Sequence, residues 1–352
     1  FLGLEFKFLK NDCYLCLIEF IIILTSNKNI MDRPYVVGID IGGQSAKIGI
    51  VDTRGTVLSQ TAIKSNDTNS HVEFIDNLCS AVEKLAEKAN IPMSKIRGIG
   101  IGAPNANYYT GTIENAVNLT FGGMKVIPFA DLMSERIGLP VRLTNDANAA
   151  AVGEMTYGAA RGMKNFITIT LGTGVGSGIV VGGYVLYGHD GFAGELGHVT
   201  MVRKNGRLCG CGKTGCLEAY ASATGVARTA RELLETTDKK SVLRNIPAES
   251  ITSKDVFEAA QQGDELAIDI FDFTGTMLGE AMADFVAFSS PEAIIMFGGL
   301  TKAGDLIMKP VVKALNENVM PQWRGKIDVM FSQLNESDAA ILGASALAWE
   351  VK

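Results

Sequence analysis

The sequence has no excess of basic residues. Lys and Arg number 32 against 38 Asp and Glu, which gives a formal net charge of −6 at pH 7. A protein that holds nucleic acid by bulk charge needs the opposite sign, because it must neutralise phosphates. The composition therefore argues against a nucleic-acid partner.

The sequence also lacks a hydrophobic run of membrane-spanning length. Its most apolar stretch, residues 13–25, is interrupted by Glu19, whereas crossing a bilayer takes about 20 apolar residues. A secretory signal is missing too, because the first basic residues are offset by acidic ones and no small-residue cleavage site follows. We therefore expect no membrane partner, a cytoplasmic location, and six cysteines that are not used for a disulfide framework.

Residues 1–30 differ from the rest of the chain. They are rich in Phe, Leu and Ile, and the sequence begins with Phe instead of Met. We interpret Met31 as the natural start and residues 1–30 as translated upstream sequence or a tag-like extension. The alternative interpretation is a membrane-associating N-terminal helix.

The remaining composition is that of a large globular protein. Apolar residues make up 47% of the chain and charged residues 20%, which allows a large core and excludes disorder. At about 150 residues per domain, the length predicts two domains. Glycine is abundant, at 39 of 352 residues, without a collagen-like period, and this abundance needs an explanation.

A pattern of strand, glycine turn, strand, tight turn and strand occurs twice. The expected strands are residues 35–41, 46–51 and 57–63 in the first half, and 166–171, 176–181 and 184–187 in the second. Each half continues with helices and a further strand, and closes on a strand followed by a helix of small residues. The repeat predicts an α/β fold of two β-β-β-α-β-α-β-α units with a ligand cleft between them.

The first turn of each half is rich in glycine, at residues 40–45 and 171–178. Without Cβ atoms, backbone N–H groups can approach phosphate oxygens closely. A Rossmann site would place such glycines between a strand and a helix, and a P-loop would add Gly-Lys-Ser/Thr, so neither motif is present. Either turn alone could be an ordinary tight hairpin, but two at matching positions of a repeat favour phosphate binding.

Asp146 follows a buried-type strand and precedes a helix of small residues. One interpretation is a helix N-cap, worth about 1 kcal/mol. The other is catalytic, since Asn145 and Asn148 add polar groups at the same strand end and a carboxylate there could take the proton from a substrate hydroxyl.

The sharpest signal is the spacing His-x10-Cys-x-Cys-x4-Cys, formed by His198, Cys209, Cys211 and Cys216. One imidazole and three thiolates make a closed tetrahedral set for Zn²⁺, and glycines let the short loop wrap the ion. We predict a structural zinc site, with a disulfide or unrelated free thiols as the alternatives. A catalytic zinc is not expected, because the protein fills all four positions.

Five motifs in order resemble the ROK family (repressor, open reading frame, kinase), in particular its bacterial ATP-dependent glucokinases, over about residues 35–350. The motifs are Asp-x-Gly-Gly (40–43), Asn-Asp-Ala-Asn-Ala-Ala-Ala-x-Gly-Glu (145–154), Leu-Gly-Thr-Gly-x-Gly (171–176), Gly-x-x-Gly-Glu-Leu-Gly-His (191–198) and Cys-Gly-Cys-Gly-x-x-Gly-Cys-Leu-Glu (209–218). The resemblance implies the duplicated ribonuclease-H-like fold of actin and hexokinase, with two lobes that close on a sugar and Mg-ATP. We place the N-terminal lobe at residues 31–148, with a C-terminal helix at 338–352 packing back on it. The C-terminal lobe is placed at residues 149–337, with the zinc loop at 198–216.

By this resemblance the chain is a hexose kinase that makes glucose 6-phosphate for glycolysis, with Asp146 as general base. The residues implied for the sugar hydroxyls are Asn145, Asp146, Glu195, His198 and Glu218. Those implied for Mg-ATP are Asp40 near Mg²⁺, Gly42 and Gly43 in the first loop, Gly172, Thr173 and Gly174 in the second, and Gly298 and Gly299 at the nucleotide end. His198 would serve both zinc and sugar, and a homodimer or homotetramer is implied.

The sequence departs from the family pattern at two positions, and it leaves other functions open. Gln44 replaces a usual Thr of the first loop, and Asn105 replaces a usual Gly, although Asn tolerates a positive φ.

The same site chemistry would suit N-acetylmannosamine, N-acetylglucosamine or fructose. A ROK transcriptional repressor would carry a basic DNA-binding segment ahead of the sugar domain, whereas residues 1–30 are apolar. A non-catalytic sugar sensor is the third alternative.

Overall fold

The computed structural model describes residues 33–123, 125–334 and 338–350. The interpretations made for residues 1–30 fall outside this described part of the chain. Within it, no helix is both long and apolar enough to cross a membrane.

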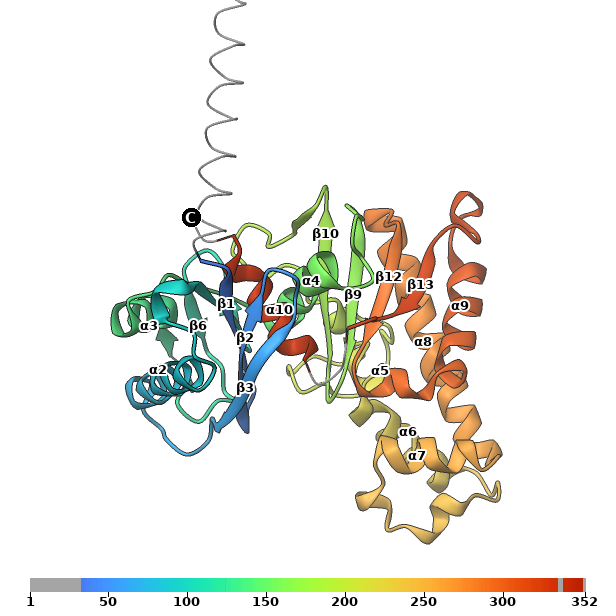
Figure 1. The fold of residues 1–352 in the computed structure, drawn as a ribbon. Coiled ribbons are helices and arrows are strands. Elements are labelled where there is room, and N and C mark those ends of the chain that lie inside the picture. Colours follow the sequence, from blue (N-terminus) through green and yellow to red (C-terminus); the bar gives the residue numbers. More distant parts are fainter. Residues whose placement is uncertain (1–32, 124, 335–337, 351–352) are drawn as a thin grey trace, which may run out of the picture.

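Two five-stranded sheets carry the fold (Figure 1). Both have the strand order 3-2-1-4-5 when the strands of each sheet are numbered along the chain. In each sheet the first three strands pair antiparallel and the last two add in parallel. The first sheet contains β1 (Tyr35–Ile41), β2 (Ser45–Asp52), β3 (Val57–Lys64), β4 (Ile96–Gly102) and β8 (Val141–Thr144). The second contains β9 (Phe166–Leu171), β10 (Val175–Val181), β11 (Tyr184–Val185), β12 (Ala293–Phe297) and β13 (Asp328–Phe331). The predicted duplication is confirmed.

One strand is shorter than expected. The sequence predicts a strand over residues 184–187, but β11 ends at Val185. Tyr187 lies outside the strand and stacks on Tyr108, with ring centroids 4.1 Å apart. A small third sheet, which the sequence did not reveal, follows β4 and consists of β5 (Ala106–Asn107), β6 (Thr112–Glu114) and β7 (Val126–Ile127).

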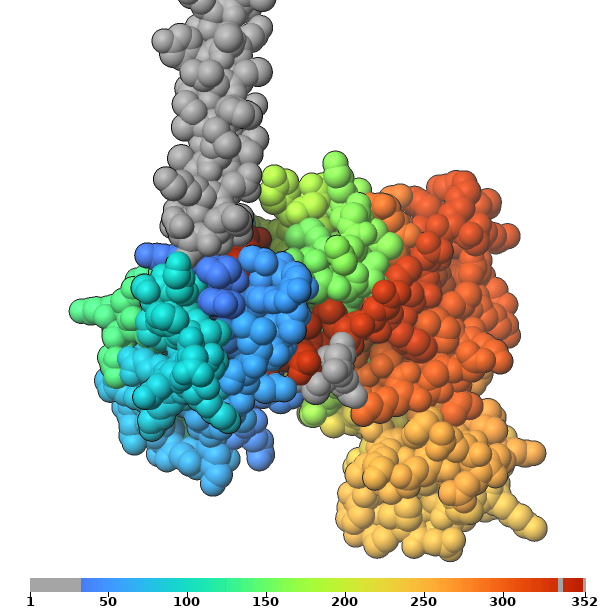
Figure 2. Space-filling view, in the orientation of Figure 1, coloured from blue at the N-terminus to red at the C-terminus, as the bar shows by residue number. Residues whose placement is uncertain are grey.

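Helices pack on the sheets, and each sheet has its own apolar core. Strands β1 and β4 are buried over nearly their whole length, as expected for strands covered on both faces. The α-helices are α2 (His71–Lys88), α3 (Phe129–Ile137), α4 (Asp146–Tyr157), α5 (Glu218–Ala221), α6 (Ala223–Thr236), α7 (Ser253–Gln261), α8 (Glu265–Ser289), α9 (Asp305–Asn318) and α10 (Ala339–Ala348). Short 3₁₀ helices lie at Met93–Lys95, Leu196–His198, Val242–Asn245, Ala248–Ser250, Gly299–Ala303 and Pro321–Trp323. Figure 2 shows the first half of the chain in blue beside the second half in orange, with α6 and α7 projecting below.

Helices α4 and α10 cross between the two sheets. At the crossing, a Cβ atom added to Gly153 would lie 2.7 Å from the Cα atom of Gly343, so neither position has room for a side chain. Helix α10 comes from the end of the chain but packs on β1 and β4 of the first sheet. The predicted lobe boundaries remain a prediction.

Replacing Gly100 in β4 is expected to destabilise the protein strongly. In Gly100→Ala, the new Cβ would lie 1.9 Å from the carbonyl oxygen of Ala344 in α10, and two backbones cannot relieve such a clash by a rotamer change. We expect a loss of about 3 kcal/mol, at the upper end of overpacking effects. Thermal unfolding of the variant measures the loss, and a melting temperature equal to that of the parent protein would contradict this packing.

Candidate active site

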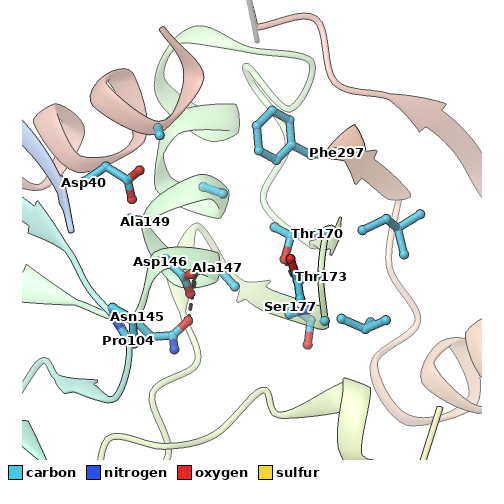
Figure 3. Close-up of a pocket in the computed structure, with 18 of the residues that line it drawn as sticks. Asp40, Pro104, Asn145, Asp146, Ala147, Ala149, Thr170, Thr173, Ser177 and Phe297 are labelled. Atoms are coloured by element: carbon cyan, nitrogen blue, oxygen red, sulfur yellow. Dashed lines mark hydrogen bonds between the residues drawn. The ribbon is translucent and has the colours of Figure 1, made fainter. Parts of the chain in front are cut away.

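A cavity of about 570 Å³ opens between the two sheets, and its walls come from both (Figure 3). Most of the site residues predicted from the sequence line it, namely Asp40, Asn145, Asp146, Gly172, Thr173, Gly174, Glu195, His198, Glu218 and Gly298. Gly42, Gly43 and Gly299 are not part of this lining. The structure thus brings together side chains that are more than 170 positions apart in sequence.

Asp146 is the first residue of α4, directly after the chain leaves β8. The helix cap is Asn145, whose Oδ1 accepts the N–H of Ala147 at 2.9 Å. The N-cap interpretation of Asp146 is therefore wrong, because the helix begins one residue earlier than expected. The carboxylate of Asp146 accepts the same N–H at 2.8 Å and remains exposed to the cavity, where a substrate can reach it.

The position of Asp146 deep in the cleft raises its pKa, because the surrounding protein disfavours the charged form. The hydrogen bond from Ala147 offsets part of this effect. A carboxylate with a raised pKa is a better proton acceptor than an ordinary one, provided that it is still ionised at the working pH. The Asp146 carboxylate therefore faces the cavity and is more basic than that of an ordinary aspartate.

Asp40 lies at the end of β1, near Asp146 (Figure 3). Burial raises the pKa of Asp40 to about 6, and the negative charge of Asp146 adds to this effect, while Lys47 opposes it. The two carboxylates lie at the same edge of the first sheet and form a site of negative charge, which Lys47 opposes without cancelling. Such oxygen ligands suit a hard divalent cation such as Mg²⁺.

Removing the Asp40 charge is expected to stabilise the protein at alkaline pH. The pKa is about 6 in the folded protein against 3.8 for the unfolded group, so folding binds a proton between these pH values and stability falls as the pH rises through them. At pH 8, without added Mg²⁺ or nucleotide, Asp40→Asn should be up to about 3 kcal/mol more stable than the parent protein. The difference should vanish below about pH 4. Thermal unfolding across this pH range measures it, and a constant difference would contradict the assigned pKa.

Three of the residues implied for sugar binding, Glu195, His198 and Glu218, face the cavity from the second half of the chain. His198 and Glu195 belong to one turn, and the His198 Nε2 atom lies 3.9 Å from Glu195 Oε2. Desolvation in the cleft raises the pKa of Glu195, His198 lowers it, and the charges of Asp146 and Glu218 raise it. This array of carboxylates and an imidazole can both accept and donate hydrogen bonds, as hydroxyl groups require.

The predicted zinc ligands are brought together. The ligand atoms of His198, Cys209, Cys211 and Cys216 all lie within 4.8 Å of one another. The Sγ atoms of Cys211 and Cys216 are 3.8 Å apart, and the Cys209 Sγ atom is 3.7 Å from His198 Nδ1. A tetrahedron with Zn–S bonds of about 2.3 Å has edges of about 3.8 Å, so this set fits Zn²⁺. Because Nδ1 faces the thiols and Nε2 faces Glu195, the geometry leaves one ring nitrogen for a substrate.

The two glycine turns differ in their access to the cavity. The turn at residues 172–174 lines it, as predicted. The first turn, at Gly42 and Gly43, does not line the cavity. The N–H of Gly42 donates to the carbonyl oxygen of Ser45 at 3.0 Å, and a Cβ atom added to Gly43 would lie 2.9 Å from the carbonyl oxygen of Asn118. The phosphate role of Gly42 and Gly43 remains a prediction.

A second cavity of about 360 Å³ adjoins the 172–174 turn. The two cavities share Leu171, Gly172 and Thr173. Its other walls are largely apolar, with two lysines, and the residues are Ala223, Ser253, Lys254, Phe257, Phe271, Gly299, Leu300, Lys302 and Ala303. Gly299 therefore lines this second cavity.

Sequence reasoning missed several residues of the main cavity. Asn118 lines it from the first half of the chain, beside Asn105, which the sequence had already singled out, and Ser177 and Phe297 line it from the second half. Asn118 lies in the loop between β6 and β7, with no strand or spacing signal beside it. Asn105 adopts a φ of 53°, which confirms that asparagine meets the backbone demand of a position where the family usually has glycine.

Comparisons with known proteins agree with this architecture. The ROK family model matches residues 36–351. A glucokinase of Halalkalibacterium halodurans is 39% identical over 323 residues, which cover 91% of this chain and 96% of the relative. A glucokinase of Thermotoga maritima is 34% identical, with coverage of 91% and 99%.

A solved structure shows the same fold. The ROK family glucokinase from Streptomyces griseus, in complex with glucose and AMPPNP, superposes with a TM-score of 0.73 at 34% identity, covering 89% of this chain and 98% of that one. The family model spans nearly all of the described residues, and the predicted two-lobed, duplicated fold is confirmed. This chain belongs to the ROK family.

Proposed function

We propose that this protein is an ATP-dependent hexose kinase that phosphorylates the 6-hydroxyl of glucose in the cytoplasm. The observation that carries the proposal is the content of one cavity: Asp146, the glycine turn at 172–174, and the Glu195–His198 pair all line it. A base, a phosphate-binding turn and a hydroxyl-binding array are the parts that sugar phosphorylation requires. The glucokinase names of the relatives support glucose as the acceptor.

Asp146 acts on the acceptor. Its carboxylate is exposed to the cavity and its pKa is raised, so it can accept the proton of the 6-hydroxyl as that oxygen attacks the γ-phosphorus of ATP. Asn145, Glu195, His198 and Glu218 hold the remaining hydroxyls. Their main contribution is alignment, because phosphoryl transfer gains chiefly from positioning and charge stabilisation.

ATP, the phosphoryl donor, occupies both cavities in this proposal. The 172–174 turn, which the cavities share, binds the phosphates, and the apolar walls around Phe257, Phe271 and Leu300 accept the adenine base. Asp40 would hold Mg²⁺, which when bound supplies positive charge that offsets the negative charge of the phosphates. The first turn, with Gly42 and Gly43, and Gly298 at the end of β12 complete the donor side.

Zinc would be held by His198, Cys209, Cys211 and Cys216, and when bound it supplies a structural clamp. The chain itself then orients the sugar. With Nδ1 committed to the cluster, the tautomer of His198 is set and Nε2 is presented to the cavity beside Glu195.

A coupled assay with ATP and Mg²⁺ over a panel of hexoses tests the proposal. We expect the highest kcat/KM with glucose and the product glucose 6-phosphate. A higher kcat/KM with N-acetylmannosamine, N-acetylglucosamine or fructose would replace glucose as the substrate. No ADP production with any hexose would refute the kinase and favour a non-catalytic sugar sensor.

Light scattering, which gives the mass of the protein in solution, tests the predicted homodimer or homotetramer.

A further inference from the structure

The phosphate turn at 172–174 is held by the segment that follows the last cysteine of the metal cluster. Three hydrogen bonds connect them. The N–H of Ala223 donates to the Gly172 carbonyl at 2.9 Å, and the Thr224 hydroxyl donates to the Thr173 carbonyl at 2.9 Å. The N–H of Val175 donates to Glu218 Oε2 at 3.0 Å. The residues of the segment that form these bonds are Glu218 in α5, and Ala223 and Thr224 in the first turn of α6.

These bonds determine which way the peptide groups of the turn face. In a trans peptide the carbonyl of one residue points opposite to the N–H of the next, and the described residues contain no cis peptide. Because the carbonyls of Gly172 and Thr173 point toward α6, the N–H groups of Thr173 and Gly174 point away from it. Among the hydrogen bonds of the described residues, neither N–H finds a protein acceptor. Both residues line the cavity, so these donors are available to phosphate oxygens.

We infer that Thr224 is a positioning residue for the phosphoryl donor: its hydroxyl holds the Thr173–Gly174 peptide so that the Gly174 N–H faces the phosphates of ATP. Without this bond the peptide can rotate, which removes a donor and turns a carbonyl oxygen toward the phosphates. Gly174 also approaches this segment closely, because a Cβ atom added there would lie 2.3 Å from Glu218 Oε2, the atom that accepts the Val175 N–H. This inference rests on the proposed ATP-dependent activity.

The test compares Thr224→Val, which keeps the shape but removes the hydroxyl, with Thr224→Ser, which restores it. Loss of one hydrogen bond is expected to raise KM for ATP about three- to tenfold in Thr224→Val. KM for glucose should not change, since Thr224 lies outside the lining of the main cavity. Thr224→Ser should return KM for ATP to the parent value. The Thr224 hydroxyl also lies 2.9 Å from that of Ser222, the N-cap of α6, so the melting temperature should fall slightly in Thr224→Val and match the parent in Thr224→Ser.

Thr236→Val is the matched control. Thr236 also lies in α6 and its hydroxyl also donates to a backbone carbonyl, that of Glu232, but this bond lies within the helix. The control should leave all kinetic constants unchanged. An unchanged KM for ATP in Thr224→Val, or an equal rise in KM for glucose, would overturn the inference.

Binding of a non-hydrolysable ATP analogue, measured by calorimetry, separates this inference from the proposed function. If the parent protein phosphorylates no hexose, the proposed function fails, yet weaker analogue binding by Thr224→Val would still support the positioning role. If the parent is active and binds the analogue with the same affinity as Thr224→Val, only the positioning role fails.

Discussion

Asp146→Asn is expected to lower kcat for glucose phosphorylation by about 10²- to 10⁴-fold, the range for loss of a general base. Asparagine keeps the side-chain oxygen that accepts the Ala147 N–H, so the start of α4 should be preserved. The amide cannot take the proton from the sugar hydroxyl, however. Steady-state kinetics measures kcat. Calorimetry measures the Kd for glucose, which should stay close to that of the parent protein.

Asp131→Asn is the control for this experiment. Asp131 also lies in the first turn of a helix, α3, but it is exposed and outside the cavity lining. The control should retain full turnover. Near-normal turnover in Asp146→Asn would show that proton removal does not depend on this carboxylate, and the assignment of the base would be wrong.

Cys211→Ser is expected to release the metal and to impair both folding stability and sugar binding. Cys211 is exposed, so the substitution itself disturbs no core packing. The free energy of metal binding is coupled to folding of the loop, and its loss leaves His198 without a fixed tautomer. We expect kcat/KM for glucose to fall on the order of 10- to 100-fold, as when groups that orient a metal-bound histidine are lost.

Elemental analysis gives the metal content directly, and thermal unfolding gives the stability. Cys79→Ala is the control, because Cys79 is buried in α2 and is not part of the cluster. It should keep the metal content of the parent protein. If Cys211→Ser also kept one zinc per chain, the ligand set would be wrong.

The local signals in the sequence were sufficient for much of the fold and the site. Glycine turns between strands predicted both meanders, and the His-Cys spacing predicted a cluster whose ligand atoms do converge. Other features depend on contacts between distant segments. Asn118 reaches the cavity from a loop, and Phe257 and Phe271 form a wall with Leu300, although nothing near them in sequence marks a binding site.

The exact start of α4 illustrates the same limit. Asn145 and Asp146 are both good helix caps, and choosing between them depends on where β8 ends in the sheet. That end is set by pairing with β4, which lies about forty positions earlier.

The amino-acid sequence by itself determined the repeated fold, the family and the chemical types of the site residues, because short-range spacing and glycine turns carry that information. Only the tertiary structure decided which of these residues share one cavity, and that segment 218–224 forms hydrogen bonds with the glycine turn at residues 172–175. The physical reason is that hydrogen bonds between distant backbones form only after the sheets and helices have packed, so their partners leave no local trace in the sequence.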